Sequence, residues 1–196
     1  MGFEIEIKAW VDDPGRVKEI ISQFADYGGE FRKEDGYWYR PGSPASDGRA
    51  GEGGIPVTGI RIRRERRTDP RGGISQTVLV TCKTKELREG LEVNDEREFA
   101  VSDGEAFAEL LGRLGLEQGK TKTKHGWVWT WEGITAELTE VAGLGWFAEM
   151  EILADNRRPQ TVKDARDRLF ALLEKLGIGR EKIEGRYYTE LLNCNG

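Results

Sequence analysis

The 196-residue sequence lacks the features that mark several large classes of protein. Two cysteines, Cys82 and Cys194, are too few for a disulfide scaffold. There is no apolar run long enough to span a membrane, and an acidic strand pattern follows Met1 where a secretory signal would be apolar. The net charge of −5 argues against a broad basic nucleic-acid surface. We therefore expect a cytoplasmic globular protein with neither a nucleic-acid nor a membrane partner.

Charge itself is abundant, although the two signs nearly cancel. One third of the residues are charged, and the 37% hydrophobic content is enough for a packed core. The length fits one domain, which we place at residues 1–192 with a tail at 193–196. Residues 41–59 hold six glycines and three prolines and are predicted to be a surface insertion.

Hydrophobic periodicity predicts many strands and a few helices. Apolar and charged residues alternate from Phe3 to Val11, as in a strand with two different faces. Further strands are predicted at residues 31–39, 59–67, 75–85, 91–101, 119–124, 127–131, 134–141 and 147–153. Helices are predicted from Asp13-Pro14 to Gly28-Gly29, from a Ser102–Glu105 capping box to Gly115, at 161–176 before Gly177, and at 187–192. The fold class is α+β and mostly β, an antiparallel barrel with outer helices.

Charged side chains recur at every second residue of at least six predicted strands. The apolar positions between them are what the helices need to pack on, so the charged faces would point into the barrel. An interior lined by acids and bases is costly unless it holds water, metal and an anionic ligand. Arginine and lysine bind phosphate oxygens, and paired carboxylates bind hard divalent cations. The pattern therefore indicates a metal–polyphosphate site.

Glu4-x-Glu6-x-Lys8 resembles the ExExK signature of the CYTH superfamily, the triphosphate tunnel metalloenzymes. The family's later motifs follow in order, as Arg61-Ile62-Arg63, Thr81-Cys82-Lys83, Glu96 with Glu98, Lys122 with Lys124, and the segment 143–151, Gly-Leu-Gly-Trp-Phe-Ala-Glu-Met-Glu. The ending Tyr188-Thr189-Glu190-Leu191-Leu192 is similar to the close of the class IV adenylyl cyclase branch. The match covers nearly the whole chain apart from 41–59.

The resemblance implies an eight-stranded antiparallel closed barrel whose tunnel binds a nucleoside triphosphate or inorganic triphosphate. It implies that Mg²⁺ or Mn²⁺ would be held by Glu4, Glu6, Glu149 and Glu151. The triphosphate would be held by Lys8, Arg61, Arg63, Lys83, Lys122 and Lys124, with Glu96 and Glu98 as further tunnel acids. Glu6, Lys8 and Glu137 are the predicted catalytic residues. Whether the chain forms a homodimer is left open by the sequence.

One position departs from the cyclase branch, whose Leu-Asp-x-Val reads Leu138-Thr139-Glu140-Val141 here. The Thr139 hydroxyl cannot act as a base near neutral pH, although Glu137 on the same strand face could take its place. The leading prediction is a class IV-like cyclase converting ATP to cyclic AMP and pyrophosphate. The alternatives are an inorganic or organic triphosphatase releasing the terminal phosphate and a non-catalytic nucleotide- or polyphosphate-binding module. The Tyr188–Leu192 ending favours the first, and Thr139 favours the other two.

Overall fold

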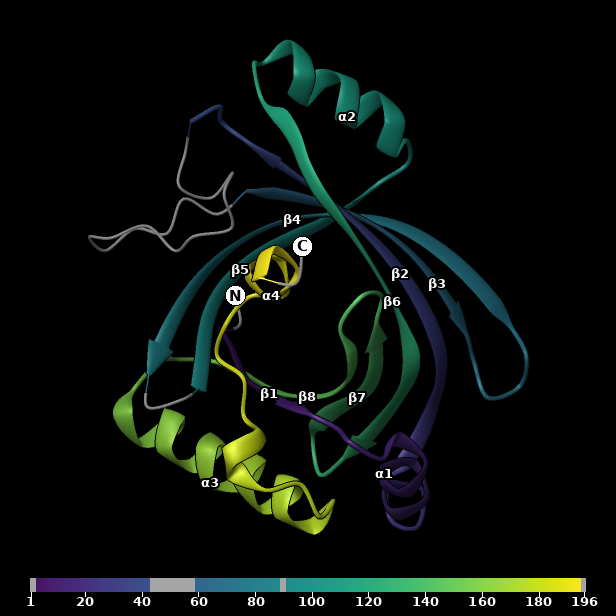
Figure 1. Ribbon diagram of the computed structural model, residues 1–196, viewed down its shortest axis with the longest axis vertical. Helices are drawn as coiled ribbons and strands as arrows, with labels where there is room; N and C mark the ends of the chain where they lie inside the picture. Colours follow the sequence, from purple (N-terminus) through teal and green to yellow (C-terminus); the bar gives the residue numbers. More distant parts are fainter. Residues whose placement is uncertain (1–2, 43–58, 89–90, 195–196) are drawn as a thin grey trace.

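The computed structural model describes residues 3–42, 59–88 and 91–194, and for 83–88 and 194 it describes the backbone only. Eight antiparallel strands close into a barrel in the order β1-β5-β4-β3-β2-β6-β7-β8 (Figure 1). They are β1 (Phe3–Trp10), β2 (Asp26–Tyr39), β3 (Ile60–Thr68), β4 (Ile74–Arg88), β5 (Leu91–Val101), β6 (Glu117–Trp131), β7 (Ile134–Val141) and β8 (Gly145–Ala154). The predicted fold class is confirmed.

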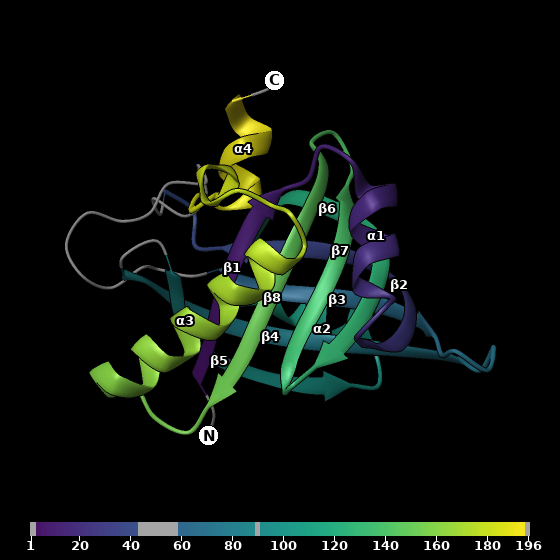
Figure 2. The same cartoon turned by 90° about the horizontal axis from the view of Figure 1, so that it is seen from below.

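Helices cover the outside of the barrel and one of its ends. They are α1 (Pro14–Ile21), α2 (Gly104–Arg113), α3 (Pro159–Lys175), a 3-10 turn (Arg180–Lys182) and α4 (Tyr188–Cys194). Figure 2 shows α3 lying along the outer face of β1 and β8, with α1 beside β7. Ile7 of β1 and Met150 of β8 point outward into a cluster with Leu169 and Leu172 of α3, and all four are fully buried. The main apolar core therefore lies between barrel and helices, which leaves the barrel interior to polar side chains.

The prediction that Gly28-Gly29 ends the first helix is wrong. Helix α1 begins at Pro14 with Asp13 as its N-cap, as predicted, but it ends at Ile21. Both glycines belong to β2, at an irregularity in its ladder with β6. Gly29 has φ +110°, and a Cβ there would lie 2.1 Å from the Thr68 carbonyl oxygen. Glycine is needed because two backbones meet, not because a helix stops.

Other boundaries differ from the prediction, and for two of these differences the local cause is clear. Asp103 caps α2 in place of Ser102, because its carboxylate accepts the amides of Glu105 and Ala106 at 3.0 Å. The strands predicted at 119–124 and 127–131 are one strand, β6. Gly126 does not interrupt this strand; glycine is needed there because a Cβ would clash with the β7 backbone.

The predicted insertion at 41–59 falls mostly outside the described residues. Within the described ranges, no helix has the length and apolarity to cross a membrane.

Candidate functional site in the barrel interior

The inner face of the barrel carries the charged side chains, as the alternation along the strands predicted. The buried charged residues that line it are Lys8, Lys33, Asp35, Arg63, Glu65, Glu92, Lys122 and Lys124. Burial of this many charges is stable only when each has a close partner of opposite sign. The pairing pattern therefore shows how the tunnel wall is organised.

Asp35 lies between two cations, one on each neighbouring strand. Arg63 of β3 donates to the two Asp35 oxygens at 2.7 and 3.0 Å, and the Lys122 ammonium of β6 lies 3.1 Å away. Burial by itself would raise the pKa of Asp35, which is 2% exposed, but Arg63 and Lys122 hold it well below its usual range. Asp35 is therefore ionised and neutralises part of the basic wall.

A second network joins β2, β6, β7 and β8. The Lys124 ammonium donates to both Glu149 oxygens at 2.8 and 3.0 Å and lies 3.6 Å from Glu137, which Lys33 approaches at 2.5 Å. The Tyr188 hydroxyl also donates to Glu149, at 2.6 Å. Burial raises the pKa of Glu149, but the adjacent Lys124 outweighs it and the net shift is downward. Burial lowers the pKa of Lys33 to about 8, because Glu137 offsets only part of the desolvation.

The third group lies on β3, β4 and β5. Arg61 approaches Glu96 at 3.2 Å and Glu98 at 3.3 Å, and it donates to the Thr81 hydroxyl at 2.9 Å. Thr81 in turn donates to Glu98 at 2.8 Å. Lys83 lies opposite Glu96 in the β4–β5 ladder, but its side chain is outside the described part of the chain.

The four acids predicted to hold a metal lie along one wall. In the β1–β8 ladder Glu6 is directly opposite Glu151, and Lys8 is opposite Glu149, while Glu4 is two residues from Glu6 on the same face. No three His, Cys, Asp or Glu side chains are gathered as a metal site among the residues whose placement is described. Glu149 is not gathered with the other acids because its carboxylate is held by Lys124 and Tyr188.

The donor set nevertheless fits a hard cation. Carboxylate and amide oxygens are what Mg²⁺ and Mn²⁺ prefer. Asn94 of β5 lies directly opposite Glu4, and its carboxamide is fully buried with no hydrogen-bond partner in the described structure. A buried amide without a partner is costly, and a ligand in the tunnel would satisfy it.

Thr139, the departure from the cyclase pattern, lies in an apolar part of the interior. It is 0% exposed, and its hydroxyl has no partner within the described residues. Its neighbour in the β7–β8 ladder is Phe147, whose ring centroid is 4.1 Å from that of Trp10 and 4.9 Å from that of Tyr188. The position where the cyclase branch has its acid is therefore fully buried, and its ladder neighbour belongs to a group of packed aromatic rings.

Four charged residues of the wall were missed in the sequence, namely Lys33, Asp35, Glu65 and Glu92. The first two continue the same alternation along β2, where Phe31, Lys33 and Asp35 all face inward and are buried. Glu92 lies opposite Glu6 and within 3.8 Å of Lys8. The period-two signal that located the other strands would have found all four.

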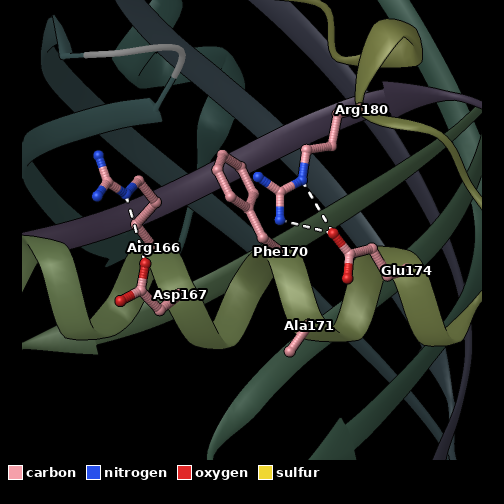
Figure 3. A pocket seen from close by; sticks show the side chains of 6 residues that line it. All are labelled: Arg166, Asp167, Phe170, Ala171, Glu174 and Arg180. Carbon is pink, nitrogen blue, oxygen red and sulfur yellow. Dashed lines mark hydrogen bonds and ion pairs between the residues drawn. The ribbon is translucent and has the colours of Figure 1, made fainter.

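A hollow outside the barrel is a poor candidate for the same chemistry. It lies along α3 and is lined by Arg166, Asp167, Phe170, Ala171, Glu174 and Arg180 (Figure 3). Arg180 is paired with Glu174 at 2.6 Å, and Arg166 lies 3.6 Å from Asp167. Both arginines have exposed acidic partners, unlike the buried cations that converge inside the barrel.

Comparison with known proteins gives one family and several relatives. The CYTH domain family model matches residues 55–188. A Methanocaldococcus jannaschii protein named as a candidate adenylate cyclase is 26% identical over 195 residues, 96% of this chain and 98% of that one. A Pyrococcus horikoshii protein of known structure is 28% identical over 96% of this chain and 97% of that one, with a TM-score of 0.78. A Hippeastrum protein described as an adenylyl cyclase candidate with dominant triphosphatase activity shares only the fold, at 15% identity, 99% and 96% coverage and a TM-score of 0.64.

Proposed function

Because the chain belongs to the CYTH domain family, we propose that it binds a triphosphate inside the barrel with a divalent metal ion and hydrolyses the terminal phosphate. The observation that carries this proposal is the convergence of buried cations from different strands on one interior. Such a surface matches a short polyanion better than any neutral ligand.

Binding would proceed by exchange of partners. Arg63 is held in bidentate geometry by Asp35, which is also the geometry in which a guanidinium binds two phosphate oxygens. Lys122 and Lys124 are also paired with carboxylates, those of Asp35 at 3.1 Å and Glu149 at 2.8 Å. A triphosphate would replace these internal acids as the partner of each cation, so the ligand-free wall is already arranged for it.

The four acids Glu4, Glu6, Glu149 and Glu151 would hold the metal. When bound, Mg²⁺ or Mn²⁺ would neutralise charge on the phosphate oxygens. Glu137 is held between Lys33 and Lys124, whose charges outweigh the effect of burial and keep its pKa below the usual value. It is therefore ionised and can orient a water molecule, whose oxygen bonds to the terminal phosphorus as the bridging P–O bond breaks.

Glu6 and Lys8 are the other proposed catalytic residues. Lys8 would stabilise the negative charge of the terminal phosphate as its bridging bond breaks, since its ammonium is buried in the tunnel wall. Glu6 lies two positions from Lys8 on the same face of β1 and opposite Glu151, so it would hold the metal next to that ammonium.

The surroundings of Thr139 favour hydrolysis over cyclisation. A cyclase needs a base near the ribose 3′-hydroxyl, and the matching position carries a fully buried hydroxyl on the residue opposite Phe147. Cyclase activity is the second candidate, favoured by the ending Tyr188–Leu192 and by the name of the Methanocaldococcus relative.

One assay separates the three functions. The protein is incubated with Mg²⁺ or Mn²⁺ and either tripolyphosphate or ATP, and the products are resolved by ion-exchange chromatography. Orthophosphate supports the triphosphatase, cyclic AMP with pyrophosphate supports the cyclase, and binding without turnover leaves a binding module. Arg63→Ala and Glu6→Gln should lose turnover, whereas Arg64→Ala, which changes an exposed side chain on the outer face of β3, should not. Equal rates for Arg63→Ala and Arg64→Ala would overturn the site.

A further inference from the structure

The C-terminal segment 183–188 is fastened across one end of the barrel. Ile183 forms a β-bridge with Ala9 near the end of β1, and the Lys8 ammonium donates to the Arg186 carbonyl at 2.5 Å. Helix α4 follows directly. It lies within the outline of the barrel in Figure 1 and beyond the ends of β1 and β8 in Figure 2. We call this end the closed mouth.

From the closed mouth, the first residue of α4 reaches into the charged interior. The Tyr188 ring centroid lies 4.5 Å from the Lys8 nitrogen, 4.8 Å from that of Lys122 and 6.0 Å from that of Lys124. Its hydroxyl donates to Glu149. One aromatic ring therefore faces three of the cations proposed to hold the triphosphate, which is a favourable arrangement for ammonium groups.

Behind the ring the molecule is apolar and tightly packed. Tyr188, Phe147, Val141 and Leu191 form a separate buried cluster, in which Tyr188 is 8% exposed. The Phe147 ring meets Tyr188 edge-on at 4.9 Å. A phosphate group could not pass through this cluster, because burying an anion among apolar side chains carries a large desolvation cost.

We propose that Tyr188 is a specificity-determining residue that forms the floor of the tunnel and sets how far a polyphosphate chain can enter. This inference rests on the proposed function. A chain entering from the opposite end would bring its terminal phosphate against the ring, within reach of the same ammonium groups, each of which has three donors. The floor fixes which phosphate lies beside the metal-binding acids. Substrates would therefore need one unsubstituted terminal phosphate.

The products formed from linear tetrapolyphosphate show directly which bridging P–O bond is broken, and so how far the chain has entered. With the floor in place, water adds to the terminal phosphorus, the first bridging P–O bond breaks, and orthophosphate and tripolyphosphate form. Removing the ring in Tyr188→Ala leaves a cavity about as deep as one phosphate. Unlike the apolar cluster behind it, this cavity is bordered by the Lys8, Lys122 and Lys124 ammonium groups, which lie 4.5 to 6.0 Å from the ring centroid. The chain would then enter one phosphate further, the second bridging bond would break, and two pyrophosphates would form.

The experiment measures the ratio of orthophosphate to pyrophosphate from tetrapolyphosphate with Mg²⁺. Tyr188→Ala should shift this ratio toward pyrophosphate by about tenfold or more, the usual effect of reshaping a pocket wall. Tyr188→Phe keeps the ring and should keep the wild-type ratio, although it loses the Glu149 hydrogen bond. Leu191→Ala, in the same cluster but behind the ring, is the matched control and should also keep the ratio. An unchanged ratio in a folded Tyr188→Ala protein would overturn the proposal.

Calorimetry provides a readout that does not need turnover. Tyr188→Ala should bind tetrapolyphosphate more tightly relative to tripolyphosphate than the wild type does, again by about tenfold. If the wild type binds these anions without hydrolysing them, the proposed hydrolysis is wrong, and this affinity ratio still tests whether Tyr188 forms the floor of the tunnel. If Tyr188→Ala does not fold, Tyr188→Leu takes its place, with a smaller shift in the same direction. Wild-type protein that binds neither anion would overturn both proposals.

Discussion

Asp35→Asn is expected to lower the stability of the ligand-free protein and to raise its affinity for a triphosphate. Asp35 is the shared partner of Arg63 and Lys122 and is 2% exposed. Removing its charge leaves two buried cations without their main counter-charge, and breaking a buried pair in this way costs about 3–5 kcal/mol. For a chain of this length that loss lowers Tm by about 6–20 °C.

The same change makes the tunnel wall more positive by one charge. Tripolyphosphate supplies the missing negative charge, so saturating ligand should stabilise the variant more than the wild type. The difference in Tm between the two proteins should therefore become smaller. The assay is thermal unfolding followed by circular dichroism, with and without Mg²⁺ and tripolyphosphate. Glu34→Gln on the outer face of β2 is the control, because its pair with Arg32 is exposed and contributes about 1 kcal/mol or less.

Two results would refute this reasoning. The first is an unfolding free energy of Asp35→Asn within about 1 kcal/mol of the wild type, which would mean that the Arg63 and Lys122 contacts do not depend on the Asp35 charge. The second is a Tm gap that stays constant or widens when tripolyphosphate is added, since the anion would then not be replacing the lost carboxylate.

Three further predictions test other parts of the structure. Lys33 has a pKa of about 8, so it is charged below that pH and becomes neutral above it. Tripolyphosphate affinity measured by calorimetry should therefore fall as pH rises through 8. Lys33→Arg stays charged and should remove this fall in affinity. Thr139→Val replaces a buried hydroxyl without a described partner, so urea unfolding should show equal or higher stability and phosphate release should be unchanged; a large loss of turnover would show that the hydroxyl contacts substrate. Gly29→Ala places a Cβ against the Thr68 carbonyl at φ +110° and should cost about 1–3 kcal/mol, whereas Gly72→Ala in the open β3–β4 turn adds no such contact and should cost less.

Much of the barrel was predictable because its strands alternate with period two. Ile5 and Ile7 face the helices while Glu6 and Lys8 face inward, so one strand shows where both the core and the charged interior lie. The boundaries were harder. Gly29 and Gly126 look like breaks in the sequence, yet each is a place where a neighbouring strand comes too close for a Cβ.

The predicted site was incomplete for a different reason. Arg63 and Lys122 were predicted to bind phosphate, but their internal partner Asp35 was not predicted, because the family motifs contain only residues expected to contact the ligand. Tyr188 was noted only as part of an ending motif. Its position over three lysines depends on where the chain returns after α3, which local periodicity cannot predict.

The central claim is that the interior cations hold a triphosphate, and calorimetric titration of tripolyphosphate with Mg²⁺ tests it most directly. The titration compares wild type with Lys122→Met inside the barrel and Lys163→Met on the exposed face of α3. We predict one site per chain, an affinity about 10- to 100-fold lower for Lys122→Met, the usual effect of losing a hydrogen bond from a charged group, and no change for Lys163→Met. Equal affinities for the two variants, or no binding by the wild type, would contradict the account.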